Sequence, residues 1–313
     1  MTLLDRQLLF VTGKGGVGKT TTAAALAELA ASTGMRTLVC EMDAKGALAA
    51  AFDVVALTFE PTALSDGLYG MAMNTEDSLR EYLRLFVRIP LIAKIGPLAR
   101  TFDFVADAAP GVKEILAVGK LCYEVAERHY DLVVVDAEAS GHIVAQIAAP
   151  RVIRQLVQVG LVRDQTAWML DILDDHERTG LVVVTTPEEM PVTESIELIE
   201  RVRTETKVAL AAVIANRVLP ALFSDREADV FARLQGASAQ AALIDHAGPK
   251  VGSVFAASAT LESRRRVGAG HLDRLRNALT DEVPLLIVPE LFTRATGRRV
   301  VTLVAESIRD EIV

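Results

Sequence analysis

The sequence predicts an α/β fold with a doubly wound, mainly parallel β-sheet. Short apolar runs rich in Val and Leu alternate with longer segments of helical periodicity along the 313 residues, as in a parallel sheet covered by helices on both faces. The first such run is followed at once by a glycine-rich loop and an alanine-rich segment, which predicts the order strand, loop, helix. The composition, with 51% hydrophobic and 24% charged residues, is that of a globular protein.

Each buried strand is expected where a short apolar run lies between polar or glycine-containing segments. These runs are too short for helices and rich in residues that favour strands, whereas the segments between them are long enough to form helices. In chain order, the strands are predicted at residues 8–12, 36–42, 131–136, 180–186, 208–215 and 284–288.

Two segments interrupt this alternation. Residues 54–130 contain a further expected strand at 69–73 and then helical pieces broken by prolines, so we interpret them as a helical insertion. A second, mostly helical stretch is expected over residues 221–280. It contains Arg264, Arg265 and Arg266, which we interpret as a solvated helix face. The prediction is a single domain over residues 1–313 with these two helical additions.

Charge and cysteine content exclude several classes of protein. The chain has 41 acidic and 33 basic residues, a net charge of −8, so no general field attracts it to nucleic acid. Cys40 and Cys122 are too few for a disulfide scaffold or a four-thiolate zinc site. The N-terminus does not resemble a signal peptide, and no apolar run approaches the roughly 18 residues that span a bilayer. We expect a cytoplasmic protein that is not integral to the membrane and has no nucleic-acid partner.

The glycine-rich loop has the spacing of a phosphate-binding loop, Gly-x-x-x-x-Gly-Lys-Thr, in the strand–loop–helix context that this motif needs. Its glycines let backbone N–H groups surround a β-phosphate, and the helix N-terminus adds partial positive charge. The lysine bridges the outer phosphates and the threonine hydroxyl binds Mg²⁺. A P-loop that holds ATP and Mg²⁺ is therefore expected. It consists of Gly13, Lys14, Gly15, Gly16, Val17, Gly18, Lys19, Thr20 and Thr21.

Lys14 sets this loop apart, because Lys19 already serves the phosphates. The variant resembles the deviant Walker A loop of a group of ATPases. The group includes partitioning and septum-site ATPases, the nitrogenase iron protein, and the arsenical-pump and tail-anchored-protein-targeting ATPases of the anion-transporting ATPase family. The resemblance implies that ATP drives dimerisation and that Lys14 reaches across a face-to-face dimer to the partner's phosphates, as an arginine finger does.

The segment after the second expected strand favours the arsenical-pump and tail-anchored-targeting branch. Residues 43–52 resemble that branch's switch I, Asp-Pro-Ala-His-x-Leu-x-x-Ala-Phe, with matches at Asp43, Leu48, Ala51 and Phe52. By this resemblance, Asp43 positions the attacking water and holds the water shell of Mg²⁺. The alternative is that Asp43 only caps a turn.

A second carboxylate belongs to Asp136, the last residue of the expected strand at 131–136. A carboxylate at the end of an apolar strand can hold Mg²⁺ through water. The following residues resemble the branch's switch II, Asp-Thr-Ala-Pro-Thr-Gly-His, so Gly141 is expected to donate its amide to the γ-phosphate. His142 is either a switch residue coupled to the dimer interface or a neutral structural histidine. Glu138 and Ala139 depart from the pattern by adding a charge and losing a rigid proline, which suggests slow turnover.

The adenine base is expected near the last two strands. Asn216 closes the strand at 208–215, where the branch uses Asn to read the adenine edge, and an amide suits the base's donor and acceptor; a turn-forming Asn is the alternative. Pro289, Leu291 and Phe292 follow the last strand, where the branch's loop packs beside the base. Residues 186–188 also fit the branch's Pro-Glu after a strand.

The expected function is an ATPase that acts as a nucleotide-gated dimeric switch on a protein or membrane-associated client. Nothing matches the cysteines of a metalloid site, which argues against arsenite pumping. The insertion is not Met-rich, since Met71 and Met73 are its only methionines. Its apolar residues either form a modest client groove or pack the insertion onto the domain. The alternatives are a partitioning or septum-positioning ATPase, or a weakly hydrolysing regulatory subunit paired with a paralogous ATPase. The dimer partner is a second copy or such a paralogue.

Overall fold

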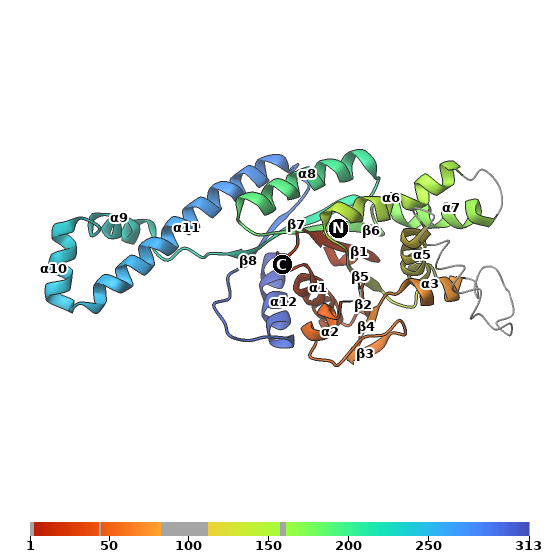
Figure 1. The fold of residues 1–313 in the computed structure, drawn as a ribbon, viewed down its shortest axis with the longest axis horizontal. Coiled ribbons are helices and arrows are strands. Elements are labelled where there is room, and N and C mark those ends of the chain that lie inside the picture. The colour runs from red at the N-terminus through yellow and green to blue at the C-terminus, as the bar shows by residue number, and fades with distance from the viewer. Residues whose placement is uncertain (1–2, 44, 83–111, 157–160, 313) are drawn as a thin grey trace.

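A computed structural model describes residues 3–43, 45–82, 112–156 and 161–312 (Figure 1). Eight strands form one sheet in the order β3-β4-β2-β5-β1-β6-β7-β8. Every neighbouring pair is parallel except β3 and β4, which confirms the predicted α/β class. The strands are β1 (Leu8–Gly13), β2 (Thr37–Glu41), β3 (Thr62–Ser65), β4 (Leu68–Ala72), β5 (Leu132–Asp136), β6 (Thr179–Thr185), β7 (Ala209–Val218) and β8 (Leu285–Pro289).

Helices cover both faces of the sheet, and alternate side chains of each central strand point to opposite faces. In β1, Leu9 and Val11 pack with the face that carries α1, α2 and α12, whereas Leu8 and Phe10 pack with the face that carries α5, α6, α7, α8 and the end of α11. The helices are α1 (Lys19–Ser32), α2 (Ala47–Ala51), α3 (Thr75–Tyr82), α5 (Val112–Ala126), α6 (Ser140–Leu156), α7 (Leu161–Leu173), α8 (Glu189–Glu205), α9 (Asp225–Arg233), α10 (Ala237–Ala247), α11 (Lys250–Ala278) and α12 (Arg298–Ile312), preceded by a 3-10 turn, η1 (Leu3–Asp5).

The segment expected as a helical insertion begins inside the sheet. Residues 62–65 form β3, an edge strand that pairs antiparallel with β4. The sequence has no apolar run at this strand, because its side chains are only half-buried or exposed. The expected strand at 69–73 is β4. The prolines Pro90, Pro97 and Pro110, and the apolar residues between them, lie outside the described residues.

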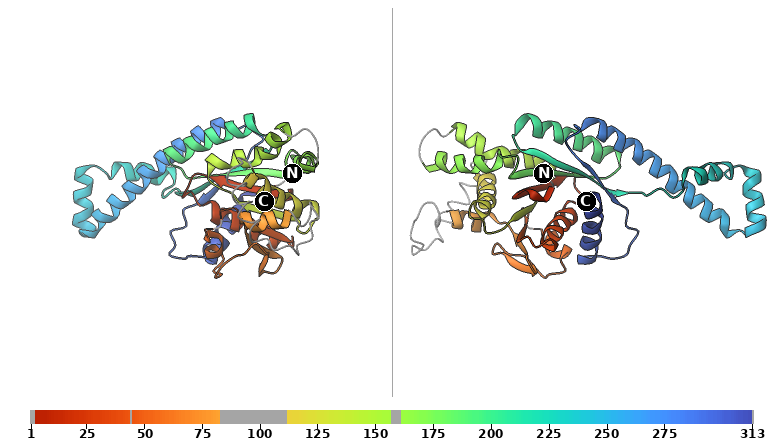
Figure 2. Two further views of the ribbon diagram at one scale, coloured as in Figure 1. Left: turned by 45° about the vertical axis from the view of Figure 1, so that its right-hand side comes forward. Right: turned by 180° about the vertical axis from the view of Figure 1, so that it is seen from behind.

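A helical arm projects from the body of the molecule (Figures 1 and 2). It contains α9, α10 and the first part of α11, and the stacked rings of Phe223, Phe231 and Phe255 hold it together, with centroids 4.5 and 4.3 Å apart. The second part of α11 packs on α8. Of the predicted solvated arginines on α11, Arg265 pairs with Glu262 at 2.8 Å, and the other two are exposed.

The topology brings three loops together at the carboxyl edge of the sheet. Strand β1 lies between β5 and β6, while the chain leaves β1 through α1 to reach β2 on the far side of β5. Ligands of open α/β sheets bind where the strand order reverses in this way. The loops after β1, β2 and β5 meet there.

A membrane-spanning helix needs a longer apolar stretch than any of the described helices contains.

Candidate active site

A cavity of about 370 Å³ lies where the loops after β1, β2 and β5 meet. It collects residues that are far apart in the chain: part of the P-loop, the segment after β2 and the segment after β5. Five of the predicted site residues line it, and the others do not. The lining residues are Gly15, Lys19, Thr20, Glu41, Asp43, Lys45, Ala47, Asp136, Ala137, Glu138, Ala139 and His142.

The P-loop closes tightly against the sheet, and two of its glycines are there for steric reasons. Gly18 has a φ of 98° and precedes α1; a Cβ at this position would lie 2.4 Å from Nδ2 of Asn216. The same Nδ2 donates a hydrogen bond to the carbonyl of Val17 at 2.8 Å. A Cβ on Gly13 would lie 2.1 Å from the carbonyl oxygen of Val184. Side chains at these two positions would clash, so only glycine allows the tight turn from β1 to α1. The backbone amides that follow Gly18 lie at the N-terminus of α1, where they can bind phosphate.

The two lysines of the loop have different surroundings. Lys19 lines the cavity, and its Nζ donates a weak hydrogen bond to the carbonyl of Lys14 at 3.5 Å. Burial lowers the pKa of Lys19, and the nearby Asp136 opposes this shift. Lys14 lies outside the lining. Its Nζ donates instead to Oε1 of Glu194 on α8 at 2.5 Å.

Thr20 and Asp136 line the cavity and contact each other. The Thr20 hydroxyl donates to Oδ2 of Asp136 at 2.6 Å. Asp136 is only 6% exposed, and burial raises its pKa to about 6 although the Thr20 hydrogen bond and the charge of Lys19 oppose the shift. Oδ1 of Asp136 is buried and receives no hydrogen bond from the part of the chain that the structure describes. The two side chains proposed from sequence as Mg²⁺ ligands on different elements are therefore in direct contact.

Asp43 and Glu138 share one cation, Lys45. Asp43 lines the cavity and forms an ion pair with Lys45, and this pairing raises the pKa of the Lys45 ammonium. Glu138 contributes further to that shift by its charge. The carbonyl of Glu138 accepts the Thr12 hydroxyl at 2.9 Å, which fixes the start of the segment after β5. Lys45 thus offsets part of the negative charge that Glu138 adds.

Comparison with known proteins agrees with this geometry. The family model described as anion-transporting ATPase matches residues 6–166 and 161–281, which include the P-loop, the segments after β2 and β5, and strand β7, which contains Asn216. The chain belongs to the anion-transporting ATPase family. This membership confirms the family predicted from the sequence.

Three relatives of the anion-transporting ATPase family show how far the similarity extends. ATPase BagA of Mycobacterium tuberculosis is 30% identical over 226 residues, covering 69% of this chain and 66% of the relative. ATPase ASNA1 homolog 1 of Paramecium tetraurelia is 29% identical over 159 residues, 49% of this chain and 47% of the relative. The ASNA1 homolog of Babesia bovis is 29% identical over 168 residues, which cover 51% of this chain and 43% of the relative. The chain thus spans about two thirds, or less, of the length of these relatives.

Glu41, Lys45 and Ala47 are cavity residues that the sequence did not indicate as functional. Glu41 stands inside an expected strand, where its charge is the one available signal: a carboxylate is rarely buried in a strand without a partner. Lys45 stands where the switch I pattern of the anion-transporting ATPase family has Ala, so the departure itself was a signal.

The residues expected near a base lie outside the cavity. Asn216 uses its Nδ2 to hold the P-loop and its Oδ1 to accept the N–H of Arg217 at 3.0 Å. Asn216 lies inside β7 rather than at its end, and these bonds hold its side chain against the P-loop and the next residue of the strand. Phe292 is 64% exposed with a φ of 44°, and Leu291 packs beside the buried core. The lining also omits Gly13, Lys14, Gly16, Val17, Gly18, Thr21, Gly141 and Pro289.

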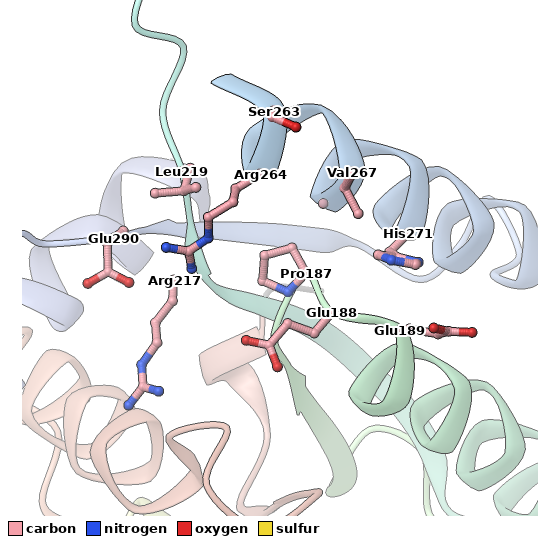
Figure 3. Close-up of a pocket in the computed structure, with 11 residues that line it drawn as sticks. Pro187, Glu188, Glu189, Arg217, Leu219, Ser263, Arg264, Val267, His271 and Glu290 are labelled. Carbon is pink, nitrogen blue, oxygen red and sulfur yellow. The ribbon is translucent and has the colours of Figure 1, made fainter. Parts of the chain in front are cut away.

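A second cavity of about 480 Å³ opens between the start of α8, the end of β7 and α11 (Figure 3). Arg217 adjoins both this cavity and the P-loop, because its Nη1 donates to the carbonyl of Gly16 at 3.5 Å. Pro187 and Glu188, which the sequence placed after a strand, line it with Arg264 and His271 from α11. No pattern in the sequence predicts that α11 meets the Pro187 and Glu188 segment in this anion-transporting ATPase.

Proposed function

We propose that the chain binds Mg-ATP in the cavity at the carboxyl edge of the sheet and hydrolyses it as one half of a nucleotide-gated dimer. The observation that carries this proposal is the direct Thr20–Asp136 hydrogen bond at 2.6 Å beside Lys19. A P-loop threonine and a strand-terminal aspartate in contact are the pair that holds Mg²⁺ in P-loop NTPases.

The charge of the cavity supports a divalent cation with the nucleotide. Four carboxylates, from Glu41, Asp43, Asp136 and Glu138, face the ammonium groups of Lys19 and Lys45, so a polyphosphate alone would be repelled. When bound, Mg²⁺ would neutralise charge on the β- and γ-phosphates. Within the described ranges no three carboxylate, imidazole or thiolate side chains gather around one point. Phosphate and water oxygens would therefore complete the ligand set, as is usual for Mg²⁺.

The chain's own groups supply the remaining roles. Amides of the P-loop and Lys19 bind phosphate oxygens, and Thr20 and Asp136 orient the cation. Asp43 positions the attacking water once it leaves Lys45. Lys14 acts on the phosphates of the partner, for which it must leave Glu194. These two ion pairs support slow turnover of the isolated chain, because each occupies a side chain that the reaction needs.

We further propose that the dimer partner is a second copy or a paralogous ATPase, and that the switch acts on a protein or membrane-associated client. The family membership supports both statements. Native mass spectrometry of the tagged chain from its own cells, with ATP and Mg²⁺ present, tests the first: masses of one chain type or of two distinguish the partners. Membrane-segment proteins in the eluate would support a membrane-associated client, and salt-sensitive DNA in their place would support the partitioning alternative.

Phosphate release by the purified chain tests the catalytic proposal. We expect Mg²⁺-dependent release that is lost in Thr20→Ala, because the variant lacks both the metal-binding hydroxyl and the bond to Asp136. The matched control is Thr260→Ala, which removes a hydroxyl from the distant α11. Equal release by the Thr20→Ala variant and the wild type would refute the assigned site.

A further inference from the structure

Glu41 is a buried carboxylate with one oxygen in use and one oxygen free. It is the last residue of β2 and is 3% exposed. Its Oε1 accepts the backbone N–H of Ala47 at 2.9 Å, at the start of α2. Its Oε2 is buried, and no described residue donates a hydrogen bond to it. Leaving a charged oxygen in this state costs folding free energy, so the free oxygen requires an explanation.

A second buried oxygen of the same kind lies across the sheet. Strands β2 and β5 are parallel neighbours, and Glu41 stands in register with Asp136. Asp136 also ends its strand and is 6% exposed, and its Oδ1 has no partner among the residues described. Both residues line the cavity that contains the Thr20 hydroxyl. Two unpaired carboxylate oxygens thus belong to one site.

Either a proton or a cation would relieve the repulsion between the two carboxylates. The geometry favours a cation: both carboxylates line the same cavity as the Thr20 hydroxyl, and that hydroxyl uses Oδ2 of Asp136, so Oδ1 is available as a ligand. Carboxylate and hydroxyl oxygens are the ligands that Mg²⁺ prefers.

We propose that Glu41 is a further cation-positioning residue, whose Oε2 acts with Asp136 and Thr20 on the divalent cation of the cavity. This inference rests on the proposed Mg-ATP function and adds a residue to its metal site. Glu41 also ties the cation to the switch I segment, because its Oε1 holds Ala47 a few residues after Asp43. Binding of the cation would thereby fix the segment that carries the water-positioning aspartate.

The test is the affinity of Mn²⁺ for the complex with a non-hydrolysable ATP analogue, measured by electron paramagnetic resonance. Glu41→Gln keeps the side-chain length and the acceptor for Ala47 but removes the charge. We expect its Mn²⁺ dissociation constant to rise about tenfold, as for other groups that support metal ligands. Analogue binding in EDTA should be kept or strengthened, since one repulsive charge is gone. Glu28→Gln, which changes a partly buried glutamate on α1 outside the cavity, should leave Mn²⁺ affinity unchanged.

Equal Mn²⁺ affinity for the Glu41→Gln variant and wild type would overturn the proposal, and Glu41 would then share a proton with Asp136 or serve only Ala47. Should Glu41→Gln fail to fold, Glu41→Asp retains the charge on a shorter side chain. Weaker Mn²⁺ binding with intact analogue binding would support the proposal, and unchanged Mn²⁺ binding would again overturn it. If the wild-type chain binds no nucleotide, the proposed function fails, and this result is distinct from a loss confined to Mn²⁺.

Discussion

Lys14 of the P-loop and Glu194 of α8 form an ion pair, with Nζ 2.5 Å from Oε1. Their side chains are 29% and 33% exposed, so the pair lies at the surface, where its stabilising contribution is small. A lysine held this weakly is free to exchange one anion for another. The phosphates of a partner's nucleotide, which carry more charge than one carboxylate, would attract it more strongly.

Replacing this lysine tests its action across the dimer. We expect Lys14→Ala to keep nucleotide affinity within a few fold, because Lys19 and the loop amides remain, and to lose turnover by about 10³-fold, as when an arginine finger is removed. Calorimetry and phosphate release measure the two effects. Glu194→Gln is the companion variant: it frees Lys14 and should keep turnover at or above the wild-type rate. Unchanged turnover in the Lys14→Ala variant would remove the lysine from catalysis.

Asp43→Asn separates ATP binding from cleavage. The amide keeps the size of the side chain but is a poorer acceptor for a water proton, so we expect turnover to fall about 100-fold or more while ATP remains bound. Acid quenching of the complex after gel filtration should release ATP from this variant and ADP from wild type. Asp245→Asn on the exposed α10 serves as control. A wild-type rate for Asp43→Asn would show that Asp43 only caps its turn.

The buried Lys120 is expected to be among the residues on which stability depends most. Its side chain is 7% exposed, and Nζ contacts Oε1 of Glu124 at 2.6 Å and Oε1 of Glu81 at 2.9 Å. Lys120→Met would remove the ammonium beside the buried Glu124 carboxylate, whose other oxygen, Oε2, keeps its 2.7 Å contact with Nδ1 of His129. The expected cost is about 3 kcal/mol in the free energy of unfolding.

Urea unfolding measures this cost, with the exposed pair Arg201–Glu205 as reference. Arg201→Ala should cost less than about 1 kcal/mol. Adding Glu124→Gln to Lys120→Met should recover part of the loss, because the unpaired charge is gone. A cost below about 1 kcal/mol for Lys120→Met alone would show that the ion pair contributes little.

The two cysteines should be unreactive in the folded chain. Both Cys40 and Cys122 are fully buried, and burial raises the pKa of each thiol, that of Cys122 to about 12. The thiolate is the nucleophile, so a disulfide reagent should find no reactive thiol between pH 7 and pH 10. It should titrate two thiols after unfolding in guanidinium. Reaction of either thiol under native conditions would contradict the burial of the core.

The fold was predictable because its signal is local. Strands such as β5, with five buried residues in succession, can only be central strands of a sheet covered on both faces. The glycines of the loop after β1 likewise identify a tight turn. The edge strand β3 carries no such signal, since its side chains face solvent and its partner decides its structure. The sequence pattern of α9 and α10 predicts helices, but it does not predict that they project from the body as an arm.

The site was predictable only where a residue matched a motif. Thr20 and Asp136 are 116 positions apart, yet each follows a strand in a recognisable pattern, and the structure places them in contact. Glu41 and the ion pair of Asp43 with Lys45 depend on register and side-chain packing, which spacing does not encode. The placement of Asn216 against Val17 rather than into the cavity also needed the structure.

Equilibrium dialysis with a radiolabelled, slowly hydrolysed ATP analogue and Mg²⁺ tests the central proposition most directly. We predict saturable uptake of one nucleotide per chain, lost in Lys19→Ala and kept in Lys45→Ala. No saturable uptake by the wild-type chain, or equal uptake by the Lys19→Ala variant, would contradict it.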